Sequence, residues 1–167
     1  YYSYEGFTDA LIKALSHQLG QQVRVAPVHL ERLMPEEERA RVGFAKYFWG
    51  GKDAIMQRNP VLKPLARDPG EFRVVVIAAP VWAFTYPPPI GSFLAGRTFP
   101  GHSLVLVLTH EGGPRKAMDR LKSRIGDADV IGEYLVFNPG GEPDHSALVP
   151  AELVAQLARG AGSERHP

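Results

Sequence analysis

Three short loops of small, aromatic and polar residues carry the side chains that could do chemistry. They read "SYEGFT" (3–8), "PVWAFTYPPP" (80–89) and "THEGGP" (109–114). In the first, Ser3 and Thr8 offer hydroxyl donors, and Gly6 lets the backbone approach a ligand closely. A turn of small residues before a helix exposes backbone N–H groups, which bind phosphate together with the helix dipole. The alternative is that Thr8 caps a helix and Gly6 only turns the chain.

The second loop is aromatic where a sheet edge normally exposes polar residues. Trp82, Phe84 and Tyr86 could form a wall for a flat ring. The prolines at 87–89 would stiffen the chain that follows, so the wall would be preorganised. The alternative is packing beneath the next helix, which we expect for at least one of the three aromatic side chains.

The third loop places glycines beside a predicted helix start, where backbone amides could bond the polar edge of a ring. A simple turn would have the same sequence. His110 is the only histidine in the three loops. It could stabilise charge on a bound ring or donate a proton, and a loop histidine without a role is the alternative.

Alternating apolar patterns indicate the elements that position these loops. A continuous apolar run without alternation, such as 74–79, is typical of a strand covered on both faces. Helices are expected over 8–19 (closed by Gly20), 35–57 (broken at 50–51), 114–125 (with Pro114 as its first residue) and 150–159. Residues 87–96 are expected to form a turn that enters a short helix. Strands are expected over 21–28, 72–80, 102–110 and 127–139.

This alternation predicts an α/β protein, a three-layer sandwich with a parallel sheet. We expect one domain over 1–159 and a loose polar tail over 160–167. Ligands of such sheets bind at the carboxyl ends of the strands. Because each of the three loops follows an apolar strand, they should meet at one edge of the sheet.

Composition excludes several other classes. With 0 Cys there are no disulfides, thiolate metal sites or thiol nucleophiles, and we expect a cytoplasmic protein. The net charge is +1 with both signs interspersed, so we expect no nucleic-acid binding. No apolar run is long enough for a membrane span, and no cluster of residues has metal-ligand spacing.

At its three loops the sequence resembles the flavodoxin-like family. "YSYEGFT" is similar to the family's phosphate loop, and "VVVIAAPVWAFTYPPPIGSFL" and "LVLTHEGGPRKAMDRLK" are similar to its two flavin loops with their strands. "GFAKYFWGGKDAIM" resembles a segment of one subgroup, the small FMN-binding flavodoxins and NAD(P)H-dependent flavin oxidoreductases. The resemblance implies FMN as cofactor, redox chemistry and a sheet in the order 2-1-3-4-5.

The resemblance also implies which residues bind FMN. Ser3, Gly6, Phe7 and Thr8, with the backbone of Tyr4 and Glu5, would hold its phosphate. The isoalloxazine would lie against Pro80, Val81, Trp82, Ala83 and Phe84, and its pyrimidine edge would meet Thr109, His110, Gly112 and Gly113.

Three departures from the family pattern stand out. Phe7 replaces the usual Asn, which removes a donor near the phosphate, and Glu5 places a carboxylate there unless it points outward. The first strand, central in this fold, is nearly missing, because only Tyr1 and Tyr2 precede Ser3 and a strand has about five residues. We therefore expect further residues before Tyr1 in the natural protein.

The resemblance leaves two functions open. One is an oxidoreductase that passes hydride or electrons from NAD(P)H to a small acceptor such as a quinone, with no catalytic side chain required. The other is an electron carrier between protein partners, which a pI of about 8.2 disfavours because carriers are typically acidic. A homodimer is possible by analogy, and Tyr47, Phe48 and Trp49 could contribute to it, cover the flavin or pack in a small core.

Overall fold

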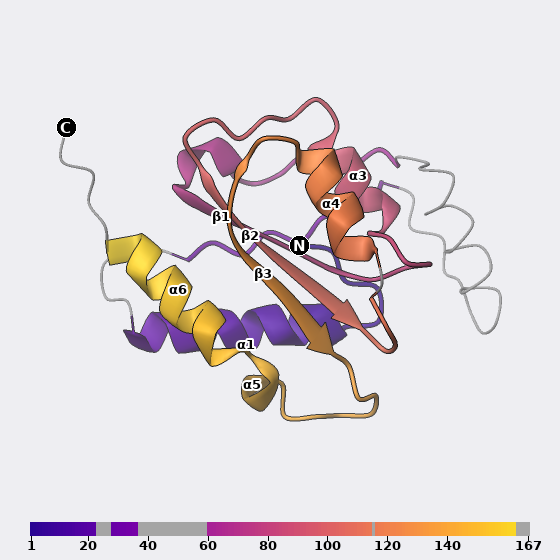
Figure 1. The fold of residues 1–167 in the computed structure, drawn as a ribbon, viewed down its shortest axis with the longest axis vertical. Helices are drawn as coiled ribbons and strands as arrows, with labels where there is room; N and C mark the ends of the chain where they lie inside the picture. Colours follow the sequence, from indigo (N-terminus) through magenta and orange to yellow (C-terminus); the bar gives the residue numbers. More distant parts are fainter. Residues whose placement is uncertain (23–27, 37–59, 115, 163–167) are drawn as a thin grey trace.

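The computed structural model describes residues 1–22, 28–36, 60–114 and 116–162. Its centre is a parallel sheet in the order β1-β2-β3 (Figure 1). The strands are β1 (Val74–Pro80), β2 (Ser103–His110) and β3 (Asp129–Phe137). The apolar runs found in the sequence are thus the strands of a covered sheet, as expected.

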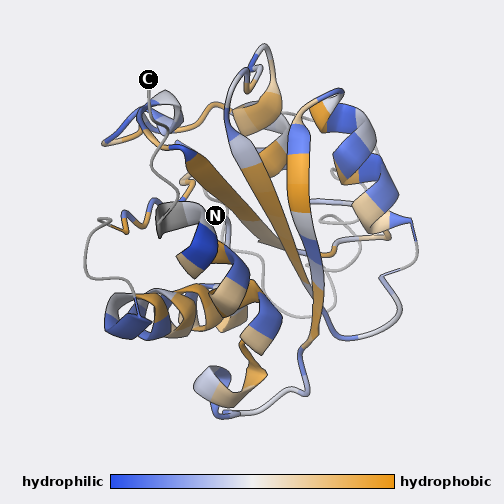
Figure 2. Ribbon diagram, turned by 60° about the vertical axis from the view of Figure 1, so that its left-hand side comes forward, coloured by the Kyte–Doolittle hydropathy of each residue, from blue (hydrophilic) through white to orange (hydrophobic). Residues whose placement is uncertain are grey.

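Helices cover both faces of this sheet and give three layers. On one face lie α1 (Phe7–Gln22), α5 (His145–Leu148) and α6 (Ala151–Gly162). On the other face lie α3 (Pro88–Leu94) and α4 (Ala117–Ile125), and a short helix η1 (Pro69–Glu71) precedes β1. Figure 2 shows the apolar strands between helices whose polar sides face outward.

Alternate side chains of β2 pack on opposite faces of the sheet, beneath different helices. Leu104, Leu106 and Leu108 pack in the core beneath α3 and α4, whereas Val105 and Val107 pack beneath α1 and α6. All five are fully buried. The three-layer α/β fold predicted from the sequence is therefore confirmed.

Residues 1–2 occupy the place of a further strand beside β1. The Tyr2 amide donates to the Ala78 carbonyl at 2.9 Å, and the Leu33 amide donates to the Tyr1 carbonyl at 2.7 Å. The lateral order is therefore segment 28–33, residues 1–2, β1, β2 and β3, which corresponds to the expected order 2-1-3-4-5. Neither residues 1–2 nor segment 28–33 forms a regular strand, so the first strand is nearly missing, as the sequence indicated.

The structure corrects the expected strand over 21–28. Helix α1 does not end at Gly20 but continues to Gln22, so Gln21 and Gln22 are helical, and Val28 is not in a strand. Glycine disfavours a helix interior by only about 1 kcal/mol, which the buried apolar face of α1 outweighs. Residues 23–27, and most of the helix expected over 35–57 with Tyr47, Phe48 and Trp49, lie outside the described residues.

Two helix boundaries also differ from the prediction. Helix α4 begins at Ala117 rather than Pro114, because a turn comes first, in which the Ala117 amide donates to the Pro114 carbonyl at 2.9 Å. Helix α6 continues through Gly160 to Gly162, beyond the end at 159 expected from the sequence. A Cβ on Gly160 would lie 3.2 Å from Val74 Cγ2, so the glycine lets this last turn approach β1 closely.

No helix in the described ranges combines the length and apolarity that crossing a membrane would take.

Candidate functional site

A cavity of about 330 Å³ lies at the carboxyl edge of the sheet, where the three loops meet. Its lining comes from the chain before α1 and the start of that helix, from the ends of β1 and β2 with the loops that follow them, and from the residue after β3. The residues that line it are Ser3, Tyr4, Glu5, Phe7, Thr8, Pro80, Val81, Trp82, Ala83, Phe84, Thr109, His110, Glu111, Gly112, Gly113 and Asn138.

The structure thus brings together every residue predicted to bind a cofactor except Gly6, which is not part of the lining. Sequence reasoning missed Glu111 and Asn138. Asn138 directly follows β3, so the rule that ligands bind at strand ends could have found it. Whether these residues bind FMN remains a prediction.

The first loop leads directly into α1. Gly6 has φ of +96°, a conformation that favours glycine, and its carbonyl accepts from the Ala10 amide at 2.9 Å. Ser3 is 1% exposed, and its Oγ has no hydrogen-bond partner among the described residues. The Ser3 carbonyl accepts from the guanidinium of Arg32 at 2.8 Å, which brings a positive charge to this loop. No pattern in the sequence indicated that Arg32 would contact this loop.

Thr8 does not cap the helix, because α1 already begins at Phe7. Its hydroxyl lies 2.8 Å from the hydroxyl of Thr109, and both residues are buried. The ring of Phe7 packs against the ring of His145 with centroids 5.1 Å apart, while Glu5 is exposed. The hydrogen bond of Thr8 therefore joins the first loop to the third.

The second loop contains a strained turn. The amides and carbonyls of Trp82 and Thr85 bond each other at 2.8 and 3.0 Å across a two-residue turn. The central residues are Ala83, with φ of +45°, and Phe84, with φ of +62°. Positive φ at both positions is typical of a type I′ turn, which usually has Asn-Gly. Side chains in this conformation are strained, and such strain is found most often at functional sites.

The three aromatic side chains of this loop have different surroundings. Trp82 lines the cavity and packs edge-on against Tyr2 and Tyr4, with ring centroids 5.8 and 5.6 Å apart. Phe84 also lines the cavity and is 50% exposed. Tyr86 is buried in the core beneath α3 and α4. Trp82 and Phe84 therefore form the aromatic wall of the cavity, whereas Tyr86 packs in the core, as expected for at least one of the three side chains.

The third loop supplies unpaired polar groups. His110 Nδ1 is buried and has no hydrogen-bond partner among the described residues. The imidazole ring of His110 packs against the ring of Phe137, with ring centroids 5.8 Å apart. The backbone amides of Gly112 and Gly113 bond no described residue. Asn138 ties the loop after β3 to this one, because its amide donates to the His110 carbonyl at 2.7 Å. Its Nδ2 lies 3.3 Å from Glu111 Oε1.

Solved structures share this fold at low sequence identity. A flavoprotein in complex with FMN from Lactobacillus acidophilus is 17% identical, with a TM-score of 0.64 over 81% of this chain and 89% of its own. A protein assigned as a flavoprotein from Bacteroides eggerthii is 18% identical, with a TM-score of 0.69 over 98% and 96% of the two chains.

A second such protein, from Bacteroides uniformis, is 15% identical, with a TM-score of 0.67 over 95% of this chain and 94% of its own. No family model matches the sequence, and no curated protein matches it either. At these identities the likeness is one of fold.

Proposed function

We propose that this chain, which has the fold of the flavodoxin-like flavoproteins, binds FMN in the cavity of the three loops. The observation that carries the proposal is the pair of unpaired buried atoms, Ser3 Oγ and His110 Nδ1. A buried polar atom without a partner costs about 1–3 kcal/mol. Both residues line the same cavity, so one ligand with a polar group at each end would satisfy both atoms.

The phosphate of FMN suits the Ser3 side of the cavity. The amides at the start of α1 point out of the helix, and the helix dipole adds positive potential there. Ser3 Oγ is free to donate, and Arg32 lies against the same loop. Because Glu5 is exposed, its carboxylate is screened by water, so it opposes the phosphate less than the sequence implied.

The ring of FMN suits the side between the second and third loops. Trp82 and Phe84 offer apolar faces. The amides of Gly112 and Gly113 offer hydrogen-bond donors for a polar ring edge, and His110 Nδ1 offers a further unpaired polar atom. When bound, FMN supplies reversible uptake of a hydride or of electrons. The chain's own residues bind and orient the ring, and no side chain of the cavity has to act as an acid or base.

We propose that the chemistry is that of an oxidoreductase, in which NAD(P)H is the donor and a small acceptor such as a quinone is reduced. Phe84 supports this proposal, because a half-exposed aromatic ring at the cavity offers a stacking surface for a flat acceptor. An electron carrier between proteins is the alternative.

The test is an absorption spectrum after FMN is added and the excess removed, followed by NADPH or NADH without oxygen. Retained yellow flavin that either nucleotide bleaches supports both parts of the proposal. Retained flavin that neither nucleotide reduces contradicts the oxidoreductase and favours the carrier. A colourless protein contradicts FMN binding itself.

A further inference from the structure

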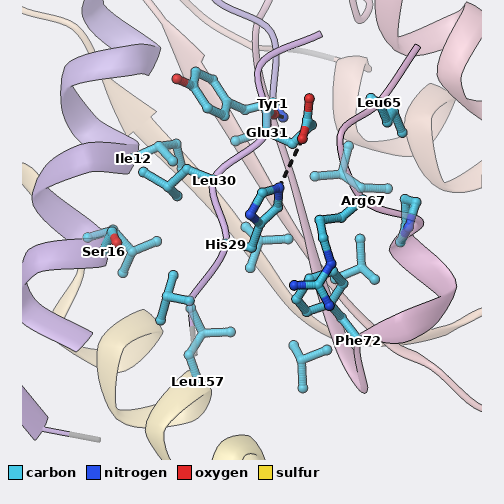
Figure 3. A pocket seen from close by; sticks show the side chains of 18 of the residues that line it. Tyr1, Ile12, Ser16, His29, Leu30, Glu31, Leu65, Arg67, Phe72 and Leu157 are labelled. Carbon is cyan, nitrogen blue, oxygen red and sulfur yellow. Dashed lines mark hydrogen bonds and ion pairs between the residues drawn. The ribbon is translucent and has the colours of Figure 1, made fainter. Parts of the chain in front are cut away.

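The two outer strands of the sheet, β1 and β3, have different surroundings. Beside β1 lie residues 1–2, segment 28–33 and a cavity, which Figure 3 shows between Ile12 and Leu157 on one side and Leu65 on the other. The edge of β1 thus lies between other parts of the same chain. The opposite edge of the sheet is β3, which Figure 1 shows between α4 and α6.

The backbone of β3 directs three residues toward this outer edge. The Asn138 amide donates to the His110 carbonyl of β2. Because alternate residues of a strand bond the same neighbour, the even-numbered residues back to Gly132 also face β2. The residues that direct their amides and carbonyls outward are Glu133, Leu135 and Phe137. On that side these groups bond no described residue.

The outer edge is closed at the start of β3. A bulge adds Ile131 to the strand, and the Ile131 carbonyl accepts from Gln156 Nε2 of α6. The Tyr134 hydroxyl donates to Gln156 Oε1 at 2.7 Å, which fixes the side-chain amide. Gly132 leaves room for this amide, because a Cβ there would collide with Gln156 Oε1. The Ile131 carbonyl is therefore already satisfied within the chain.

Pro139 closes the edge at the other end of β3. It follows Asn138, so it is the next residue that would face outward after Phe137. Proline has no N–H to donate to a further strand. The part of the edge that can pair is therefore limited to residues 133–137, which we call the open edge, and its central residue is Leu135.

The side chains at the centre and end of the open edge are apolar and exposed. Leu135 is 48% exposed and Phe137 is 54% exposed. Both lie on the α4 face of the sheet, because Val136 between them packs on the opposite face, beneath α1 and α6. Glu133 forms an ion pair with Lys122 of α4 at 2.8 Å, so the one charge in the open edge is paired. Free backbone groups beside apolar side chains favour pairing with another chain.

We propose that the open edge pairs with the same edge of a second copy of this chain, antiparallel and about a two-fold axis at Leu135. In this register Leu135 lies opposite its own counterpart, and Glu133 of each copy lies opposite Phe137 of the other. Each opposed pair exchanges both of its backbone hydrogen bonds, so every outward group of the open edge gains a partner. The two sheets thereby join into one continuous sheet.

The closed ends of the edge identify the occupant as the same chain. In the two-fold register, the next residues to face each other are Ile131 of one copy and Pro139 of the other. Pro139 has no N–H to donate, and the Ile131 carbonyl needs none, because Gln156 already donates to it. The acceptor that the proline would leave unpaired is thus satisfied in advance. This match depends on the edge meeting itself, since an unrelated strand has no reason to carry it.

The side chains also suit a two-fold arrangement. Leu135 meets its counterpart on the α4 face, and both leave water. Phe137 of each copy lies beside the ion pair of Glu133 and Lys122 in the other, so an ammonium group lies near an aromatic ring and no like charges are opposed. A surface that is complementary to itself in this way is typical of two-fold dimers.

The open edge is next to the loop cavity but is not part of it. Phe137 does not line the cavity, whereas its neighbour His110 does. The proposal therefore does not rest on FMN binding, and its test is independent of the test of the proposed function.

The first measurement is the mass of the 167-residue chain in solution, by sedimentation at a series of concentrations and without FMN. We expect the mass to rise with concentration toward twice the 18.4 kDa of one chain. A monomer throughout the series would overturn the proposal.

Charges at position 135 test the two-fold axis. Leu135→Lys and Leu135→Glu should each weaken the dimer about tenfold or more, because like charges then meet at the axis. An equimolar mixture of the two should form a heterodimer, since opposite charges meet. Val61→Lys is the matched control, because Val61 is 67% exposed and lies outside β3, and it should dimerise like the unchanged chain. Unweakened dimers of both Leu135 variants would show that the interface lies elsewhere.

Single cysteines test the register, because the chain has 0 Cys of its own. Leu135→Cys should form a disulfide with its counterpart, since the Cα atoms of a hydrogen-bonded pair are about 5.5 Å apart. Phe137→Cys should not crosslink with itself, because its two copies are about 13 Å apart along the strands. It should crosslink with Glu133→Cys in a mixture. Efficient crosslinking of Phe137→Cys with itself, or none of Leu135→Cys, would overturn the proposed register.

Discussion

The hydroxyls of Thr8 and Thr109 lie 2.8 Å apart in the interior, and no more than 3% of either residue is exposed. This bond joins the first turn of α1 to the end of β2, across 101 residues of sequence. It holds the phosphate side of the proposed FMN site against the side that would take the ring. Because both hydroxyls are buried, each has the other as its hydrogen-bond partner in place of water.

Replacing one partner should therefore destabilise the fold more than replacing both. Thr109→Val leaves the Thr8 hydroxyl buried without a partner, which should lower the free energy of unfolding by about 1–3 kcal/mol. Urea denaturation measures this loss. The double variant Thr8→Val, Thr109→Val should recover part of it, and Thr98→Val, at an exposed position, is the matched control.

Ser3→Ala should affect stability and FMN binding in opposite directions. In the free protein Ser3 Oγ is buried without a partner, so its removal should leave the free energy of unfolding unchanged or raise it by up to about 1 kcal/mol. A bond to a charged phosphate contributes about 1.5–3 kcal/mol, so FMN affinity should fall by roughly tenfold or more. Thermal unfolding and FMN titration give the two values.

Ser123→Ala, at an exposed position on α4, is the control for that variant. Unchanged FMN affinity in Ser3→Ala would show that Ser3 Oγ does not bond the phosphate.

The strained turn of the second loop predicts a stabilising substitution. Ala83 has φ of +45°, and a left-handed conformation costs a residue with a Cβ about 1–2 kcal/mol. Ala83→Gly should therefore raise the free energy of unfolding by up to about 1 kcal/mol, after the greater chain entropy of glycine is subtracted. Ala95→Gly is the matched control, because Ala95 has φ of −65° and only the entropy loss applies. A loss of stability in both variants would contradict strain at Ala83.

Local patterns in the sequence determined the layers and the edge where the loops meet. The apolar runs of β1 and β2 predicted covered parallel strands, and strand ends in such a sheet share one edge whatever the details of packing. Because that rule is geometric, the sequence alone was enough to place Ser3, Trp82 and His110 around one cavity. The resemblance to flavodoxin-like proteins predicted FMN as the cofactor, and the absorption spectrum with added FMN is the test of that prediction.

Only the tertiary structure decided contacts that depend on distant parts of the chain. Nothing local indicates that Thr8 bonds Thr109, that Arg32 reaches the Ser3 carbonyl, or that Tyr86 belongs to the core while Phe84 stays exposed. The boundaries of α1, α4 and α6 likewise followed packing rather than the glycine and proline signals.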